Sequence, residues 1–147
     1  MFNALSSGNM DKFLIIYQKI VYDYISYYDI KHENSFHNFF LGMAISTTGM
    51  YKIKSNMETG DGRGDIVMES LHPDDRPHIV IEFKQGANID ELKQVALDQI
   101  FEKKYYAKLQ GSVLYIGLAH DMKKCALISK EVIVTPSGEM ITDTPAG

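Results

Sequence analysis

The sequence has a single cysteine, Cys125, which excludes an internal disulfide bond and any cysteine-based zinc site. A reducing, cytoplasmic location is therefore the default expectation. No apolar run approaches the roughly 20 residues that a membrane-spanning helix needs, and the stretch 39–50 is interrupted by serine and threonine. The N-terminus also lacks the charged-then-apolar order of a signal peptide, so we expect no membrane partner.

Basic residues are fewer than acidic ones: the sequence has 15 Lys and Arg and 19 Asp and Glu, which gives a net charge of −4. This balance argues against nucleic-acid binding, because neutralising phosphates requires Lys and Arg. Carboxylates at an active site, however, add negative charge that a bound metal would offset. The best local basic cluster is Lys103, Lys104 and Lys108.

Two further kinds of site are absent. His72, His78 and His120 are scattered and match no zinc-ligand spacing. The glycine-rich turn at 60–62 is not a phosphate-binding loop, since no Gly-Lys-Ser/Thr follows it.

The 147 residues, 45% of them hydrophobic, fit one compact domain. Apolar spacing of three and four predicts helices, and alternation or short apolar runs predict strands. We expect helices over 10–28, 33–47 and from 88 or 90 to 109, and strands over 51–56, 65–69, 78–84, 112–119 and 125–129. Residues 1–9 are expected to be a polar lead-in and 131–147 a peripheral hairpin or loose tail, leaving 1–130 as the main domain. A helix between the third and fourth strands implies a crossover, hence an α/β fold with a mixed sheet flanked by helices.

The run 78–84 is the most informative strand. Side chains alternate between faces, and both faces begin apolar, which indicates a strand covered on both sides. Glu82 and Lys84 then share one face at the end of a buried strand. Burying a carboxylate is costly unless it is paired or binds metal.

The preceding strand places a second acid beside the first. If 65–69 and 78–84 form an antiparallel hairpin whose turn is centred near residues 73 and 74, Asp65 lies directly opposite Glu82. Opposed residues share a face with Cβ atoms about 4.5–5.5 Å apart. Two carboxylates at that distance favour a cation between them, such as Mg²⁺. A register shift of one residue would move Asp65 to the other face.

Lys84 would stand beside such a cation, where an ammonium stabilises developing negative charge. A metal lowers the pKa of its bound water and polarises a phosphate. This set of groups suits phosphodiester hydrolysis. The alternative is chance, because an Asp followed by Glu-x-Lys is common in a chain of this length.

Several further segments make the pattern more specific. In order, they are 33–42, with Glu33 and FHNFFLG; 55–66 (SNMETGDGRGDI); 79–84 (IVIEFK); 96–105, with ALDQI and KKY; and 115–119 (YIGLA). Together they resemble the PD-(D/E)XK nuclease-superfamily domain found C-terminal in bacterial AAA-ATPase-like proteins, over about residues 4–130. The resemblance implies a restriction-endonuclease-like core and a DNA-cleaving nuclease dependent on Mg²⁺ or Mn²⁺.

The resemblance also assigns roles to individual residues. Asp65 and Glu82 resemble the metal-binding acids, with the Phe83 carbonyl as a further ligand, and Glu33 resembles the first-motif acid. Lys84 resembles the catalytic lysine. Gln99 resembles a helix glutamine that lies near the site in this family, and the resemblance implies phosphate binding by Lys103 and Tyr105.

Two features depart from the family pattern. Gly64 stands before Asp65, where the family often has an aromatic residue. The ATPase module that usually precedes the domain is missing from this sequence, so the chain is either a stand-alone copy or an excised domain. An AAA-type ATPase is thus an expected neighbour or partner, DNA is expected over RNA, and a homodimer is left open.

Other polar residues have plainer interpretations. His37 shares a helix face with Glu33; a hydrogen-bonded core histidine is expected over a metal ligand. Gln99 sits in an apolar stripe and needs a partner, either the active site or a buried hydrogen bond. Arg63 would contact phosphate or, as the safer interpretation, pair with Glu58.

Two rivals to an active nuclease stay open. One is a catalytically inactive nuclease-fold module that binds nucleic acid or protein beside an ATPase. The other is a structural domain whose acids pair with lysines, in which case removing the charges together should be tolerated.

Overall fold

The computed structural model describes residues 1–30, 35–57, 64–103 and 109–142. Its helices, in chain order, are α1 (Phe2–Ser6), α2 (Met10–Tyr24), α3 (Ser35–Ala44), the short 3-10 helix η1 (Ile45–Thr47) and α4 (Ile89–Glu102). Its strands are β1 (Tyr51–Met57), β2 (Gly64–Ser70), β3 (His78–Gln85), β4 (Gly111–Asp121), β5 (Lys124–Val134) and β6 (Met140–Thr142).

The strands form one sheet in the order β1-β2-β3-β4-β5-β6. Neighbouring strands are antiparallel except β3 and β4, which are parallel and joined by the crossover helix α4. A parallel pair needs such a crossover, because a short turn cannot return the chain to the same end of the sheet. The mixed sheet flanked by helices that the sequence predicts is therefore confirmed.

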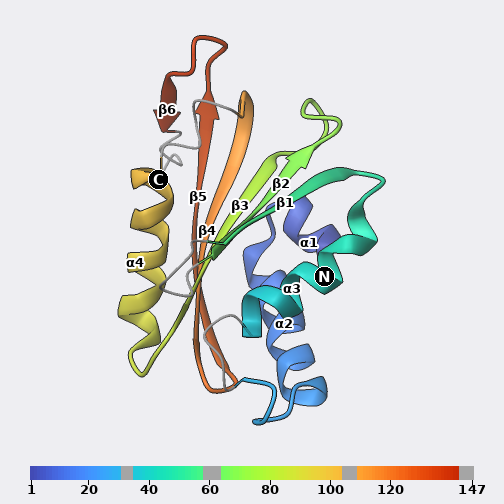
Figure 1. The fold of residues 1–147 in the computed structure, drawn as a ribbon. Helices are drawn as coiled ribbons and strands as arrows, with labels where there is room; N and C mark the ends of the chain where they lie inside the picture. The colour runs from blue at the N-terminus through green and yellow to red at the C-terminus, as the bar shows by residue number, and fades with distance from the viewer. Residues whose placement is uncertain (31–34, 58–63, 104–108, 143–147) are drawn as a thin grey trace.

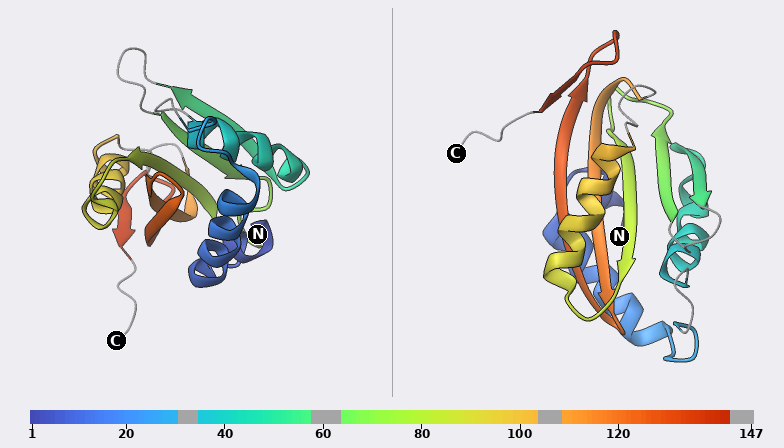
Figure 2. Two further views of the ribbon diagram at one scale, coloured as in Figure 1. Left: turned by 90° about the horizontal axis from the view of Figure 1, so that it is seen from below. Right: turned by 60° about the vertical axis from the view of Figure 1, so that its left-hand side comes forward.

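The helices divide between the two faces of the sheet. Helix α4 covers one face, and α1, α2 and α3 cover the other (Figures 1 and 2). Each face has its own buried core: the larger lies under α1–α3 and the smaller lies under α4. A sheet covered on both sides requires apolar residues on both faces of its central strands.

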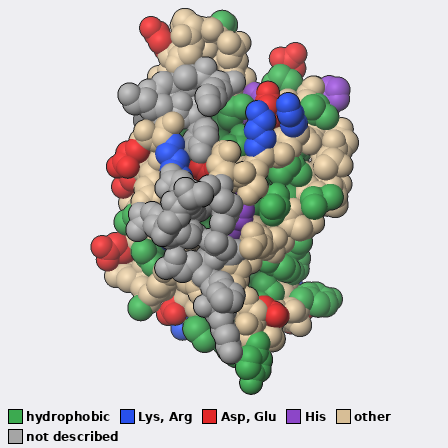
Figure 3. All heavy atoms as spheres, in the orientation of Figure 1, with side chains coloured by type: hydrophobic (Ala, Val, Ile, Leu, Met, Phe, Trp, Pro, Cys, Tyr) green, Lys and Arg blue, Asp and Glu red, His purple; other side chains and the backbone are tan. Residues whose placement is uncertain are grey.

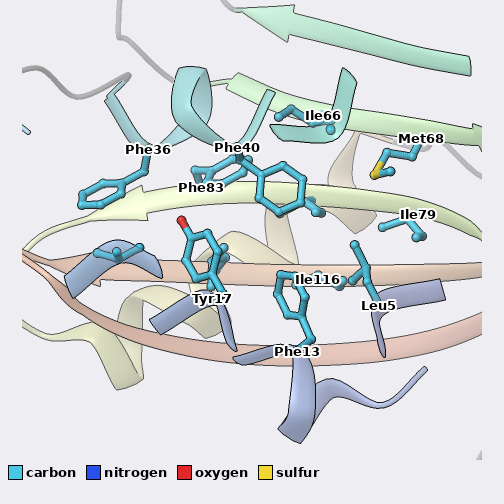
Figure 4. Close-up of a cluster of buried hydrophobic side chains, with 14 of the residues drawn as sticks. Leu5, Phe13, Tyr17, Phe36, Phe40, Ile66, Met68, Ile79, Phe83 and Ile116 are labelled. Atoms are coloured by element: carbon cyan, nitrogen blue, oxygen red, sulfur yellow. The ribbon is translucent and has the colours of Figure 1, made fainter. Parts of the chain in front are cut away.

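Strand β3 meets this requirement. Residues 78–83 are all buried. Ile79 and Phe83, which Figure 4 shows, belong with Ile81 to the core under α1–α3. Val80 belongs to the core under α4. The alternation expected from the sequence is thus confirmed, and it turns Glu82 toward the α4 side of the sheet.

The first ten residues differ from expectation. The segment expected to be a polar lead-in forms α1, and its Leu5 is fully buried against the larger core. Helix α2 ends at Tyr24 rather than residue 28, because Ile25 adopts an extended conformation. The helix expected from residue 33 begins at Ser35 within the described residues, and its last turn is the 3-10 helix η1.

The C-terminal half shows two more differences in length. Helix α4 ends at Glu102, with Lys103 as its cap, rather than continuing to residue 109. Strand β5 continues to Val134 and pairs with β6, so the segment after 130 starts inside the sheet as part of a hairpin. Among the described residues, no helix has the length and apolar character needed to cross a membrane.

Candidate functional site

The β2–β3 hairpin carries two opposed acids. Asp65 pairs directly with Glu82 across the antiparallel ladder, in the register predicted from the sequence. Both side chains have 0% of their surface exposed. Directly opposed positions lie on the same face of a sheet, so the two carboxylates meet on the α4 side.

Lys84 follows Glu82 by two residues on β3 and therefore projects from the same face. Its side chain is partly buried. It is also close enough to Glu82 for its positive charge to lower the pKa of that carboxyl. The Asp, Glu and Lys of the sequence motif are thus brought together at the end of β3.

A second lysine enters from the helix. The Lys103 ammonium at the end of α4 lies 3.3 Å from Asp65 Oδ2 and 3.2 Å from Glu82 Oε2. It also donates a hydrogen bond to Glu82 Oε1 at 3.4 Å. The Lys103 side chain is 21% exposed, so this cation joins two buried anions from the solvent side.

Charge at the site is incompletely balanced. Burial raises the pKa of Glu82 to about 7, and the negative charge of Asp65 adds to the rise. Lys103 and, to a smaller extent, Lys84 lower that pKa. The raised pKa means that burial outweighs the two ammonium groups, so the pair of carboxylates still favours additional positive charge.

A histidine on the opposite face of the β2–β3 hairpin contacts the backbone of the site. His37, buried on α3, has its Nε2 within hydrogen-bonding distance of the Asp65 carbonyl and of Ser55 Oγ, 3.2 Å in each case. Its ring packs edge-on against Phe83 with centroids 5.6 Å apart. The expectation of a hydrogen-bonded core histidine is confirmed, and it touches the main chain of Asp65 from the face opposite the carboxylates.

The remaining predicted residues are only partly placed. Gln99 lies on α4 one turn before Lys103 and is half-buried rather than buried. Three residues lie outside the described ranges, and their predicted roles stay predictions: Glu33, Arg63 and Tyr105. Lys104, Lys108 and Glu58 also lie outside these ranges.

The residues present suit a hard divalent cation. Mg²⁺ takes one or two carboxylates and keeps several waters, so Asp65 and Glu82 supply an adequate protein set. Within the described ranges, no three His, Cys, Asp or Glu side chains gather as a metal cluster. The fit therefore depends on two opposed, buried carboxylates and on the raised pKa of Glu82.

The sequence did not predict that Lys103 contacts both acids. We expected it to bind phosphate as part of a basic cluster. The available signal was its position four residues after Gln99, which places both on one side of a helix. That signal requires knowing where α4 ends and how it lies on the sheet, and neither follows from periodicity.

Comparison with known proteins agrees with this geometry. The family model described as PD-(D/E)XK nuclease superfamily matches residues 31–130, which include β1 to β4, the helix between them and both acids. Neither a curated protein nor a solved structure matches the chain.

Proposed function

Because the chain belongs to the PD-(D/E)XK nuclease superfamily, we propose that it is a metal-dependent nuclease that hydrolyses phosphodiester bonds, with DNA as the preferred substrate. The observation that carries the proposal is the direct pairing of Asp65 with Glu82, both fully buried, on the face that also bears Lys84. In a domain with only a structural role, two opposed carboxylates removed from water would add little to the stability of the fold.

We assign the metal ligands to Asp65 and Glu82, joined by the Phe83 carbonyl and Glu33. Mg²⁺ or Mn²⁺ bound there would supply a water of lowered pKa and polarise the phosphate. The carboxylates contribute fixed negative charge at buried positions, where electrostatic interactions are stronger than in water.

The lysines and neighbouring polar residues act on the substrate. The Lys84 ammonium donates hydrogen bonds to the phosphate and stabilises the charge that develops during hydrolysis. Lys103, Tyr105 and Arg63 bind the nucleic-acid backbone, and Gln99 orients groups at the site from α4. We further propose that the chain works beside an AAA-type ATPase, as a neighbouring domain or a partner, in keeping with the family that its motifs resemble.

The test is hydrolysis of labelled double-stranded DNA, single-stranded DNA and RNA with Mg²⁺ or Mn²⁺, and with a chelator as the blank. Lys84→Ala removes a positive charge placed at the reacting phosphate, and Asp65→Ala removes a proposed metal ligand, so each should reduce the rate by at least about 10²-fold. Lys93→Ala on α4, whose ammonium pairs with exposed Asp90, is the matched control and should retain activity. Full activity in both site variants would contradict the proposal.

One observation favours the alternative, a nuclease-fold module that binds nucleic acid or protein without cleaving. The Lys103 ammonium already contacts both acids, so the pair has a counter-charge without any metal. Calorimetric titration with Mn²⁺ separates the two functions. Heat from one saturable site supports the nuclease, and a titration without binding heat supports the module.

A further inference from the structure

The position of the Lys103 ammonium bears on how a metal enters the site. Its Nζ lies 3.3 Å from Asp65 and 3.2 Å from Glu82. Within β2 and β3, these are the two carboxylates that the hairpin register places opposite each other. Both acids are fully buried, and this one ammonium is within hydrogen-bonding distance of both. In the structure, the cation that contacts both acids is the Lys103 side chain.

A divalent ion would need the same oxygens. Mg²⁺ binds carboxylate oxygens at about 2.0–2.1 Å, so it would lie against the oxygens to which the ammonium now donates. Two positive charges a few ångströms apart repel strongly in a site with little water. The metal and the ammonium therefore exclude each other from this position.

The lysine is also placed so that it can leave. Lys103 caps the C-terminus of α4, where its backbone N–H donates to the Gln99 carbonyl at 3.1 Å. Its ammonium sits on a flexible four-carbon stem with partial exposure to solvent. The backbone hydrogen bond at the helix end does not involve the ammonium, so outward rotation of the side chain would leave that bond in place.

We propose that Lys103 is a tethered cation that offsets part of the negative charge of the acid pair before metal binds and is displaced by the incoming divalent ion. This inference rests on the proposed metal site at Asp65 and Glu82. Displacement turns the ammonium toward solvent at the rim of the site, where a substrate phosphate would approach. The same lysine would thus contact the acid pair before metal binds and the substrate phosphate afterwards.

The experiment compares the full chain with Lys103→Met and with Lys93→Met, which removes the same charge from the same helix. Mn²⁺ affinity is measured by calorimetry, and thermal unfolding is measured with a chelator and with saturating Mg²⁺. Lys103→Met should bind Mn²⁺ about tenfold more tightly, within the range for two coupled ligands. It should also unfold at a lower temperature than the wild type in chelator and lose most of that deficit in Mg²⁺, because the metal supplies the missing charge.

Each result has a definite meaning. Equal or weaker Mn²⁺ binding by Lys103→Met, with normal binding by the wild type, overturns the inference and leaves the proposed metal site standing. An equal gain in Lys93→Met also overturns it, because general charge would then be the cause. Absence of binding by all three proteins contradicts the metal site itself and, with it, the displacement.

Lys103→Gln is a second variant for the case in which Lys103→Met does not fold. If Lys103→Met is insoluble in chelator, recovery of folded protein by Mg²⁺ supports the inference, and Lys103→Gln is then used for calorimetry. Its amide donates a hydrogen bond to a carboxylate but carries no charge. Mn²⁺ binding by Lys103→Gln no tighter than that of the wild type would overturn the proposal.

Discussion

His120 is a buried histidine held by neutral partners. Its Nε2 lies 2.8 Å from the Tyr17 hydroxyl, and its ring stacks on Phe36 with centroids 3.7 Å apart. The side chain is fully buried, and this burial lowers its pKa from 6.5 to about 3. The imidazole therefore stays uncharged in the native protein over a wide pH range.

Acid should destabilise the protein through this residue. An unfolded chain protonates His120 below pH 6.5, whereas the folded chain resists protonation down to about pH 3. The stability present above pH 6.5 is therefore lost as pH falls, by up to about 1.4 kcal/mol per pH unit within that window. Chemical denaturation at a series of pH values measures the slope.

His120→Gln provides the comparison, because an amide can still hydrogen-bond Tyr17 but does not titrate. Between pH 6.5 and 3, the free energy of unfolding of His120→Gln should fall less steeply with pH than that of the wild type. The difference in slope corresponds to at most one bound proton. His72→Gln removes an exposed histidine and is the control. Identical slopes for the wild type and His120→Gln would show that burial of His120 does not govern acid stability.

At the same scale, sequence reasoning located the acids but not their counter-ion. Asp65 and Glu82 could be paired because strand alternation and a turn centred between two strands fix a register. Lys103 could not be assigned to them, because its reach depends on the end of α4 and on how that helix packs. Contacts between a helix and a sheet are tertiary, and local pattern carries no information on them.

At the scale of elements, α4 packs directly on β4 at Gly117. A Cβ placed on this glycine would lie 2.1 Å from the Lys93 carbonyl and 2.8 Å from the Leu97 nitrogen, both of them backbone atoms of α4. No side-chain rotation can relieve such a contact. A glycine inside a strand often marks a close backbone approach of this kind.

Gly117→Ala should therefore lower the free energy of unfolding by about 1–3 kcal/mol, as overpacking does. It should also reduce nuclease activity, because pushing α4 outward moves Lys103 relative to the hairpin. Urea denaturation and DNA hydrolysis measure the two effects. Gly42→Ala on α3 is the matched control, since a Cβ there meets nothing within 4 Å, and it should stabilise by up to about 1 kcal/mol. A Gly117→Ala protein as stable as the wild type would refute this packing.

Elements with long, regular patterns were predictable and short ones were not. Helix α2 has several turns of regular apolar spacing, and strand β3 has several residues that alternate between two faces. Both were located from the sequence. Helix α1 has five residues, too few to show a period, so Leu5 was not recognised as core. The strand expected at 125–129 was too short because Lys130 and Glu131 interrupt the apolar pattern. The strand continues beyond them, and residues 132–134 pair with β6.

At the scale of the whole molecule, surface charge does not favour nucleic acid by itself. The net charge is −4, and in the view of Figure 3 blue side chains are few on the surface. A protein of this balance gains little from counterion release. Attraction to a phosphate backbone must therefore come from the site and from any cation bound there.

DNA binding should consequently depend on a divalent ion. Fluorescence anisotropy with labelled DNA at constant ionic strength, using Ca²⁺ in place of the proposed metal, should give a Kd at least about tenfold lower than in chelator, since Ca²⁺ also prefers oxygen ligands. Asp65→Asn should lose this dependence while retaining the weak binding measured in chelator. Equal Kd values with Ca²⁺ and with chelator would mean that the basic side chains alone set the affinity.

The paired acids sit on consecutive strands of a single hydrogen-bonded ladder. The backbone hydrogen bonds of that ladder therefore set how the two acids face each other. The Lys103 ammonium is placed by a different element, the end of α4, so the seating of that helix on the sheet sets its distance to both acids. At the proposed metal site, a change in how the crossover helix packs on β4 would therefore alter metal affinity without altering a single proposed ligand.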